Sequence, residues 1–488
     1  MAVAARVVRC RYRCRTEVRT FAFKNALFQE RERANGRYYQ AVISRGNRLS
    51  ESLLDAASAK FDQAEVYRVE SESHPVSFEA NRLKEIMRRD TSGVALRVID
   101  QGHIGFSSTT DADREGELVD RAGSVAPFGS EASFDFPAPS EYPDVDTFDP
   151  AIPQVSQQSM IDTGQGLIER LLDEWPELLC DASVGWSTGR GRIMNSAGVD
   201  AEYEQTSYYC YIGAQLIRGT DMLNVWAGYG SSRLFGESDL DRLLQTVRRS
   251  LRWATNMAQP TSNTGDLPVI FTPRGVSATL LHPLVSGFNG KNVANGSSPL
   301  ADRWGERIVD ERISIFDDPL IPGASGSRPF DDEGVASRKH ALIDRGVAGA
   351  PLLDLQTAGQ LGKTSTGAAG RGLASSPSPG TSVIDIAAGN TDFDEMIAGV
   401  KDGLVVEALL GAGQGNELGG DFRANVSLGY RVENGEIVGR VKDTMISGNV
   451  YKVLSQVEQV SDSAEWVFGS MRSPALKCLR VEVAAKDE

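Results

Sequence analysis

The sequence predicts an α+β protein of two domains rich in antiparallel sheet, an N-terminal α/β meander domain and a β-rich C-terminal domain. The chain has 488 residues, which is too long for one ordinary domain. Helical and alternating apolar patterns occur without a βαβαβ rhythm, which argues against a doubly wound parallel sheet. The dipeptide Asn434-Gly435 lies between two alternating runs and is a strong signal for an antiparallel hairpin.

The domain boundary is predicted at the polar segment "QPTSNTGDLP", residues 259–268. We therefore expect an N-terminal α+β domain over 47–260 and a β-rich C-terminal domain over 261–488. Residues 1–46 form a basic extension, whose first twenty residues hold six arginines and one glutamate without the apolar core of a secretory signal. A targeting segment, a disordered extension and a misplaced start codon all stay open, and we expect this stretch to be disordered and outside the core.

The N-terminal domain begins with a predicted helix over residues 48–61, where apolar side chains recur at helical spacing and Ser50 is the predicted N-cap. Strand-like runs follow this helix. They cover residues 64–70, the start of 75–90, 92–100 and 103–109. The turn Asp100-Gln101-Gly102 joins the last two runs, which predicts a hairpin. A helix followed by antiparallel strands is typical of an α+β domain.

The rest of this domain alternates between irregular and regular segments. Residues 125–159 are rich in Pro, Asp and Ser and predict a long connection. A helix with one apolar stripe is expected over about 160–177, several strands over 182–229, and a second amphipathic helix over 239–258.

The C-terminal domain begins with a predicted strand and turn over residues 269–275. An apolar helix follows within "SATLLHPLVSGFNGK", residues 277–291. Residues 421–446 alternate apolar and polar side chains and turn at Asn434-Gly435, which predicts the hairpin at 421–441. Such a hairpin is suited to form the wall of a chamber or to pair with an extended peptide.

Composition excludes some classes of function. The net charge of −15 repels phosphate backbones, so we expect no nucleic-acid partner. The chain lacks a run of about 18 apolar residues, so we expect no membrane span. Five scattered cysteines are typical of reduced thiols in a cytoplasmic protein rather than of a disulfide framework.

Two segments imitate phosphate-binding loops. "GAGQGNELGG", residues 411–420, follows an apolar run, but the pattern after it predicts a strand instead of the helix whose N-terminus would hold a pyrophosphate. "GQLGKTSTG", residues 359–367, has Thr357 where a P-loop requires its first glycine. We interpret the second segment as an ordinary turn and reject a nucleotide site in both.

Three adjacent carboxylates, Asp331, Asp332 and Glu333, precede a basic cluster at 338–340. Such a group can hold a hard cation or position a water molecule. The simpler interpretation is a turn whose charges cap a strand end and pair with the basic cluster. The sequence favours this structural interpretation because it offers no second acidic group at a known distance.

A possible serine nucleophile at Ser196 is set aside. It lies in "NSAGV", residues 195–199, between two predicted strands. A nucleophilic serine needs a histidine base, and none of the four histidines is linked to it by a recognised motif. A structural turn is the favoured interpretation.

His282 lies on the apolar helix of 277–291, where a helical zinc hydrolase would carry two histidines one turn apart and a glutamate beside the metal. Its neighbours are Leu281 and Pro283, and the residues one turn further, Val285 and Ser286, are not strong metal ligands. On chemistry alone the helix cannot assemble a zinc site. A lone histidine on an apolar helix is usually a hydrogen-bonded core residue, and that is the expectation here.

Five segments in order carry a family resemblance. They are "NSAGV", "PFDDEGVASRK", "KTSTGAAG", "GDFRANVSLGYRVENGEI" and "ISGN". Together they resemble the TldD/PmbA (TldE) metallopeptidase family over roughly residues 48–476. The resemblance implies a cytosolic peptidase of two related subunits. The TldD-type subunit carries zinc on a His-Glu-x-x-x-His helix, and the PmbA-type subunit has a similar fold without those ligands.

Placed on that helix, the sequence offers Leu281 for the first histidine, His282 for the glutamate and Ser286 for the second histidine. The resemblance is therefore to the PmbA/TldE-like subunit, with no metal and no cofactor in this chain and zinc expected in the partner. The catalytic residues are unknown. The candidates for contact with a substrate channel are His282, Asp331, Asp332 and Glu333.

Three functional hypotheses follow from these observations. The first is a non-metal partner of a TldD-type zinc subunit that processes unfolded peptides. The second is a stand-alone peptide-binding or scaffold protein without a proteolytic role. The third is a hydrolase that uses a different site, such as the carboxylates at 331–333.

Overall fold

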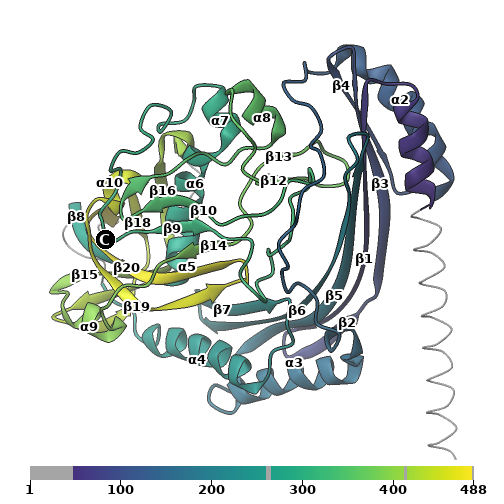
Figure 1. Cartoon of the computed structure of the whole chain (residues 1–488). Coiled ribbons are helices and arrows are strands. Elements are labelled where there is room, and N and C mark those ends of the chain that lie inside the picture. The colour runs from purple at the N-terminus through teal and green to yellow at the C-terminus, as the bar shows by residue number, and fades with distance from the viewer. Residues whose placement is uncertain (1–47, 260–264, 412–414, 486–488) are drawn as a thin grey trace, which may run out of the picture.

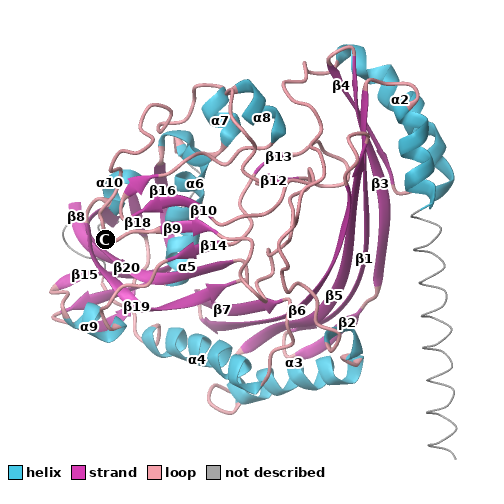
Figure 2. Cartoon of the chain, in the orientation of Figure 1, coloured by secondary structure: helices cyan, strands magenta, loops and turns pink. Residues whose placement is uncertain are grey.

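The computed structural model describes residues 48–259, 265–411 and 415–485 (Figure 1). The predicted basic extension at 1–46 lies outside the described residues, and so do Cys10 and Cys14. The chain forms two large sheets, and irregular segments run between them (Figure 2). The predicted α+β class, rich in antiparallel sheet, is confirmed.

The first sheet has seven strands in the order β4-β3-β1-β5-β6-β7, with β2 paired to β1. Every neighbouring pair in it is antiparallel. Its strands are β1 (Gln63–Glu79), β2 (Arg82–Ile86), β3 (Arg89–Asp100), β4 (His103–Thr109), β5 (Leu179–Asn195), β6 (Asp200–Arg218) and β7 (Asp221–Ser231).

The second sheet has eleven strands and is mixed, because β8 runs parallel to β15 and β14 runs parallel to β20. Its strands are β8 (Gly265–Phe271), β9 (Ile315–Asp317), β10 (His340–Asp344), β11 (Val347–Ala348), β14 (Ile384–Ile386), β15 (Asp402–Leu410), β16 (Asp421–Glu433), β17 (Glu436–Arg440), β18 (Thr444–Asn449), β19 (Val457–Val467) and β20 (Met471–Ala485). A separate pair is formed by β12 (Ala369–Gly370) and β13 (Ser378–Pro379).

Helices pack on the faces and at the ends of the sheets (Figure 1). One spans residues 48–58. The others of four or more residues are α2 (Leu118–Val125), α3 (Gln157–Leu172), α4 (Glu237–Trp253), α5 (Pro273–Val276), α6 (His282–Phe288), α7 (Gly290–Ala294), α8 (Leu355–Gln360), α9 (Phe393–Ala398) and α10 (Val450–Leu454), with a π-helical turn η4 (Ser277–Leu281) and a 3-10 helix η1 (Ala112–Glu117). None of the helices in the described part of the chain has the length and apolar character needed to span a bilayer.

Most predicted elements occur with shifted bounds, and the hairpin at 421–441 occurs as β16 and β17. Its turn residues have the positive φ angles that a tight hairpin turn needs, 50° at Asn434 and 85° at Gly435. The residues of β16 alternate between buried and exposed, as its sequence predicts. However, β16 pairs with β15 on one side and with β17 and β18 on the other, so strand addition to it is not available.

Four details of the N-terminal half differ from the prediction. Ser50 is not the N-cap, because it lies inside the helix and its hydroxyl accepts a hydrogen bond from Arg68 at 2.7 Å. β1 continues through Pro75 because β5 pairs with it from residue 65 to 78. The exposed strand β2 and the helix α2 were not predicted. The strand β2 has only exposed side chains and is determined by its pairing with β1, whereas α2 is short and buries only Leu118 and Ala122.

The favoured turn interpretations hold in the structure. Asn195 Oδ1 accepts hydrogen bonds from the backbone of Ala197 and Val199, and Ser196 Oγ accepts one from Ala64 N at 3.1 Å. Residues 361–362 form a turn after α8, and 363–367 are irregular. Strand β16 follows the segment 411–420, of which 412–414 lie outside the described residues.

The two sheets share a hydrophobic core. One cluster of buried side chains joins Val184 and Ile212 of the first sheet to Val405 and Tyr430 of the second. Tyr430 is fully buried, and its ring meets that of Trp253 on α4 edge-on at 5.2 Å. Strand β8 of the second sheet begins at Gly265, within the stretch 259–268 where the linker is predicted, and 260–264 lie outside the described residues.

The described cysteines behave as ordinary core residues. Cys180, Cys210 and Cys478 are free and buried. Burial raises the pKa of the Cys180 thiol to about 11 and that of Cys210 to about 12. These thiols therefore stay protonated near neutral pH and are poor nucleophiles.

Candidate functional site

The apolar helix predicted within 277–291 is one helical segment from Pro273 to Phe288 that includes a π-helical turn. Thr272 caps its start by accepting a hydrogen bond from Gly275 N at 3.2 Å. The π-helical turn lies directly before Pro283, which has no N–H to donate to the preceding turn. A Cβ on Gly275 would lie 2.2 Å from the carbonyl oxygen of Val406, so glycine lets this segment pack closely on β15.

His282 is exposed, and the expectation of a core histidine is wrong. Its side chain is 75% exposed, and Nδ1 lies 3.4 Å from Glu417 Oε2. The reason is helical geometry. The buried stripe of this segment recurs every four residues, at Val276, Leu280, Leu284 and Phe288. Residue 282 is two positions from the nearest members of that stripe, which turns its side chain to the opposite face.

The three positions that a zinc subunit would use do not fit a zinc ion here. Leu281 offers no ligand atom and packs against the core. His282 points to solvent with a single carboxylate beside it. Ser286 is a weak ligand type for zinc. Within the described residues there is no group of three or more His, Cys, Asp or Glu side chains placed to hold a metal ion.

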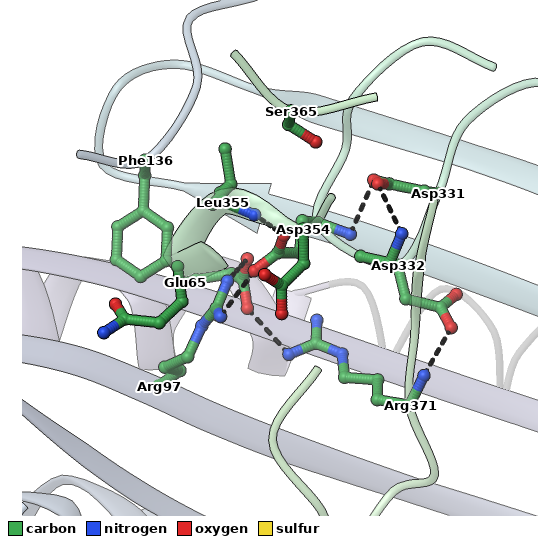
Figure 3. A network of polar contacts seen from close by, with 12 residues as sticks. Glu65, Arg97, Phe136, Asp331, Asp332, Asp354, Leu355, Ser365 and Arg371 are labelled. Atoms are coloured by element: carbon green, nitrogen blue, oxygen red, sulfur yellow. Dashed lines mark hydrogen bonds and ion pairs between the residues drawn. The ribbon is translucent and has the colours of Figure 1, made fainter. Parts of the chain in front are cut away.

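The carboxylates at 331–333 lie between the first sheet and the loops of the C-terminal half (Figure 3). Asp331 is fully buried and accepts hydrogen bonds from three backbone N–H groups. The donors are Glu333 and Val335 at Oδ1 and Ala369 at Oδ2, at 2.9–3.0 Å. Asp331 thus stabilises the turn itself, as the structural interpretation proposed.

Glu333 joins a chain of buried ion pairs. Arg97 of β3 donates to Glu333 at 2.7 Å and to Glu65 of β1 at 2.8 Å. Arg371 donates to the other oxygen of Glu65 at 2.7 Å, and its backbone N–H donates to Asp332 at 2.9 Å. Two arginines and two glutamates of this network are at most 3% exposed. The network therefore ties the first sheet to the C-terminal half (Figure 3).

The predicted pairing of the three carboxylates with the basic cluster at 338–340 is wrong. Arg338 donates to the carbonyl of Ser365, Lys339 pairs with Asp318 at 3.2 Å, and His340 contacts the carbonyl of Ala350 at 2.8 Å. Glu333 pairs instead with Arg97, which is far away in the sequence, and Asp332 pairs with Arg328, four residues before it, at 3.5 Å. The predicted partners are wrong because the carboxylates turn inward while the basic residues after them lead into β10.

The long connection at 125–159 contributes to this network. Phe134 and Phe136 lie over the Arg97 guanidinium, with ring centroids 5.1 Å and 5.0 Å from its central carbon. Aromatic faces attract a cation and exclude water from it. The connection thus covers the charged groups, although it has little regular secondary structure.

The electrostatic environments of the two glutamates differ. Burial raises the pKa of Glu333 to about 7. The charge of Arg97 acts against this rise, and the charges of Asp331 and Asp354 add to it. Burial acts on Glu65 in the same direction, but Arg371 and Arg97 together hold its pKa below the ordinary value. Glu65 therefore stays ionised, whereas Glu333 titrates near neutral pH.

We expect the Glu333→Gln variant to gain stability relative to the wild type as the pH rises. Glu333 titrates at about 7 in the folded chain, against an ordinary value of 4.5. Between these values the folded state binds more protons than the unfolded state, so the wild type loses stability as the pH increases. The Glu333→Gln variant has no titrating group at this position, so it does not lose this stability. Calorimetric melting of both proteins at pH 5, 6, 7 and 8 measures the difference in Tm between variant and wild type. A difference that stays constant across this series would contradict the raised pKa of Glu333.

Of the four candidate residues, Asp332 lines a cavity. The cavity has a volume of about 320 Å³ and lies between β1, β6 and the loop at 325–332. Its other charged or phenolic lining residues are Tyr67, Tyr203 and Arg328. We call it the polar pocket. Asp332 Oδ1 lies 3.5 Å both from the Tyr67 hydroxyl and from Arg328 Nη1.

The chemistry of the polar pocket favours binding rather than covalent catalysis. Burial raises the pKa of Tyr203 to about 12 and that of Tyr67 further, and the charge of Asp332 acts in the same direction on both. Both phenols therefore stay protonated and can donate hydrogen bonds at neutral pH. With a carboxylate and a guanidinium beside them, the pocket offers donors and acceptors of the kind that amide groups need.

The structure separates the candidates that the sequence grouped. Asp331 and Glu333 are buried structural groups, Asp332 faces the polar pocket, and His282 is exposed on another segment. Tyr67, Tyr203 and Arg328 were missed. A signal existed for Arg97, because a cation within the otherwise apolar strand of 92–100 requires a buried partner.

Comparisons with known proteins agree with this architecture. The PmbA/TldA metallopeptidase C-terminal domain matches residues 264–485, and PmbA/TldA metallopeptidase domain 1 matches residues 64–126. The chain is 25% identical to an uncharacterized protein of Methanocaldococcus jannaschii over 430 residues, which is 87% of this chain and 97% of the relative. It is 26% identical to the metalloprotease PmbA of Escherichia coli O157:H7 over 426 residues, which is 84% of this chain and 90% of that protein.

Among solved structures, the fold is similar to that of TldE from Thermococcus kodakarensis. The TM-score is 0.80 at 24% sequence identity, and the match covers 90% of this chain and all of the other. The chain therefore belongs to the PmbA/TldD family of metallopeptidase-like proteins.

Proposed function

We propose that this chain is the non-metal subunit of a two-subunit peptidase and acts with a TldD-type zinc subunit on unfolded peptides. The observation that carries the proposal is the set of residues at the metal positions of the helix, Leu281, His282 and Ser286, which do not fit zinc. The segment is nevertheless fully helical and anchored in the core through Val276 to Phe288. The helix therefore serves as a structural element in this chain and lacks the zinc-binding pattern of a TldD-type subunit.

The proposed role of this chain is to hold an extended peptide against the partner. The polar pocket supports this role, since Tyr67 and Tyr203 can donate to peptide carbonyls and Asp332 can accept from peptide N–H groups. Contacts to the backbone would bind many sequences, which suits an unfolded substrate. Holding a peptide in one orientation lowers the entropic barrier of a reaction performed elsewhere. The buried, free cysteines support a reducing compartment and a cytoplasmic location.

The test is reconstitution of activity. We expect this chain alone to leave an unfolded peptide such as reduced, carboxymethylated casein uncut. Mixed with a TldD-type protein, it should give cleavage that a chelator abolishes and that neither protein shows alone. Elemental analysis of the dialysed chain should show well under one zinc ion per molecule.

Two variants sharpen this test. His282→Ala should leave the reconstituted activity within about twofold, since His282 is exposed and is given no role. Asp332→Asn should reduce it, because Asp332 is the acceptor in the polar pocket. Cleavage by the isolated chain that is lost in His282→Ala would refute the proposal. Peptide binding without any gain in cleavage from the partner would favour the stand-alone peptide-binding alternative.

A further inference from the structure

One face of the first sheet carries no charged side chain over four rows of residues. β1, β5 and β6 lie in register there, and the rows are Val69/Gly191/Tyr203, Ser71/Gly189/Gln205, Ser73/Ser187/Ser207 and Pro75/Gly185/Tyr209. We call these residues the uncharged track. The other face of the same strand segments carries Arg68, Glu70, Glu72, Arg190, Arg192, Glu202 and Glu204. The absence of charge is therefore a property of one face and not of the strands as a whole.

The uncharged track begins at the polar pocket and is open to solvent. Tyr203 and Gln205 belong to both, and the opposite wall of the pocket comes from loops of the C-terminal half, so the track faces that half (Figure 1). Further along, Ser71 is exposed, and Ser187 and Ser207 are half-buried. A ligand held in the polar pocket can therefore extend onto the track.

Glycines on β5 make room for two tyrosine rings of the track. A Cβ on Gly185 would lie 2.6 Å from the hydroxyl oxygen of Tyr209, and a Cβ on Gly191 would lie 3.5 Å from Cε1 of Tyr203. The two rings thus lie across β5 at its glycine positions. A tyrosine offers an apolar ring surface together with a polar hydroxyl. The track therefore has an aromatic surface at each end, with serine, glutamine and glycine between them.

The polar pocket at the start of the track lacks hydrogen-bond partners. Within the described residues, the buried atoms Ser325 Oγ, Arg328 Nε and Ser382 Oγ have no partner, and all three side chains belong to the lining of the pocket. Asp332 Oδ1 has only the two contacts at 3.5 Å. Buried polar groups are normally paired, and leaving one unpaired costs free energy. A polar ligand can supply these partners, which is independent evidence for a ligand at this end.

The charges near the far end of the track lie at its rim. Arg89 of β3 and Asp181 of β5 are exposed, and their charges act on the hydroxyls of Tyr209 and Tyr211, respectively. Because these two charges have opposite signs, the rim favours neither a cation nor an anion. A charged side chain that lay on the track would lose hydrating water without gaining a counter-ion.

We propose that a bound peptide continues from the polar pocket along the uncharged track, and that the track takes extended segments without charged side chains. The inference rests on the proposed function, which assigns peptide binding to the polar pocket, and it adds the class of segment that is bound. The track runs along β6 from Tyr203 to Tyr209, so an extended segment of about seven residues covers it.

Isothermal titration calorimetry of the full chain tests the proposal with three peptides of about twelve residues whose ends are blocked. The neutral peptide repeats Gly-Ser-Gln-Tyr, and the other two have Lys or Glu in place of every Gln. We expect the neutral peptide to bind and both charged peptides to bind at least about tenfold more weakly. The net charge of −15 would by itself favour the Lys peptide. Equal or tighter binding of the Lys peptide, or no binding of the neutral peptide at millimolar concentration, would overturn the proposal.

Matched variants locate the binding on the track. Ser207→Glu places a carboxylate at its centre and should weaken binding of the neutral peptide by about tenfold while strengthening that of the Lys peptide. Gln245→Glu adds the same charge at an exposed position of α4, which packs on the other face of β6, and should leave all affinities within about twofold. Tyr209→Ala, which removes a ring of the track, is the second variant if Ser207→Glu does not fold. Unchanged affinity in a folded Ser207→Glu or Tyr209→Ala chain would refute the assignment.

Reconstitution with a TldD-type protein separates this inference from the proposed function. If the isolated chain prefers the neutral peptide but the mixture shows no cleavage, the track is supported and the proposed function fails. If the mixture cleaves while the chain binds the three peptides equally, the proposed function is supported and the track is refuted.

Discussion

Replacing Arg97 by Met is expected to lower the free energy of unfolding by about 3–5 kcal/mol at pH 8. Methionine fills much of the same volume but leaves Glu333 without its cation, and Glu333 is fully buried. Glu65 keeps Arg371 at 2.7 Å, so the loss falls mainly on Glu333. Because Glu333 can take up a proton, the loss should be smaller at pH 5 than at pH 8.

Urea denaturation measures this loss, and Arg190→Met on β5 is the control. Arg190 pairs with Glu202 at 2.6 Å, but Glu202 is 41% exposed, so the control should lose less than about 1 kcal/mol. The shared core between the sheets favours a single cooperative transition. Similar losses in both variants would show that the buried network has no special role in stability.

Replacing Phe288 by Ala is expected to lower the free energy of unfolding by a comparable amount, about 3–5 kcal/mol. Phe288 ends the helical segment that occupies the metal position of the family, and it is fully buried. Its ring contacts Trp304 at a centroid distance of 5.9 Å and packs in the main core of the C-terminal half. Removing it leaves a cavity that the surrounding strands cannot fill without moving.

The control for this variant is Phe128→Ala. Phe128 is 89% exposed, so its loss should change stability by no more than about 0.5 kcal/mol. The same denaturation experiment applies to both. A loss below about 1 kcal/mol in Phe288→Ala would mean that the helix is not held by its apolar stripe, and the explanation for the exposure of His282 would fail with it.

Local patterns were sufficient for much of the fold. The alternation in 421–433 and the turn at Asn434-Gly435 recur in the structure as predicted, because both depend on neighbouring residues only. The amphipathic stripes gave α3 and α4 within a few residues of their observed bounds. β2 could not be predicted in this way, since all its side chains are exposed and its pairing with β1 determines it.

The same distinction applies to the candidate site, where some features follow from the local sequence and others only from the fold. The absence of the His-Glu-x-x-x-His pattern at 281, 282 and 286 is a property of the residues themselves and needed no structure. The direction of the His282 side chain was misjudged, although the four-residue spacing of Val276 to Phe288 was available in the sequence. The polar pocket combines Tyr67, Tyr203 and Asp332, which come from two strands and a distant loop. No local pattern relates residues of that separation.

The sequence by itself determined the class of fold, the family and the residues at the metal positions, because periodicity and residue type are local properties. Only the tertiary structure decided which charges are buried together. Arg97 and Glu333 are 236 residues apart, and Arg371 and Glu65 are 306 apart. The local sequence indicates that Arg97, in an apolar strand, needs a buried partner, but it identifies the partner of none of these four groups. The fold removes them from water as a set, and in that environment they must pair with one another.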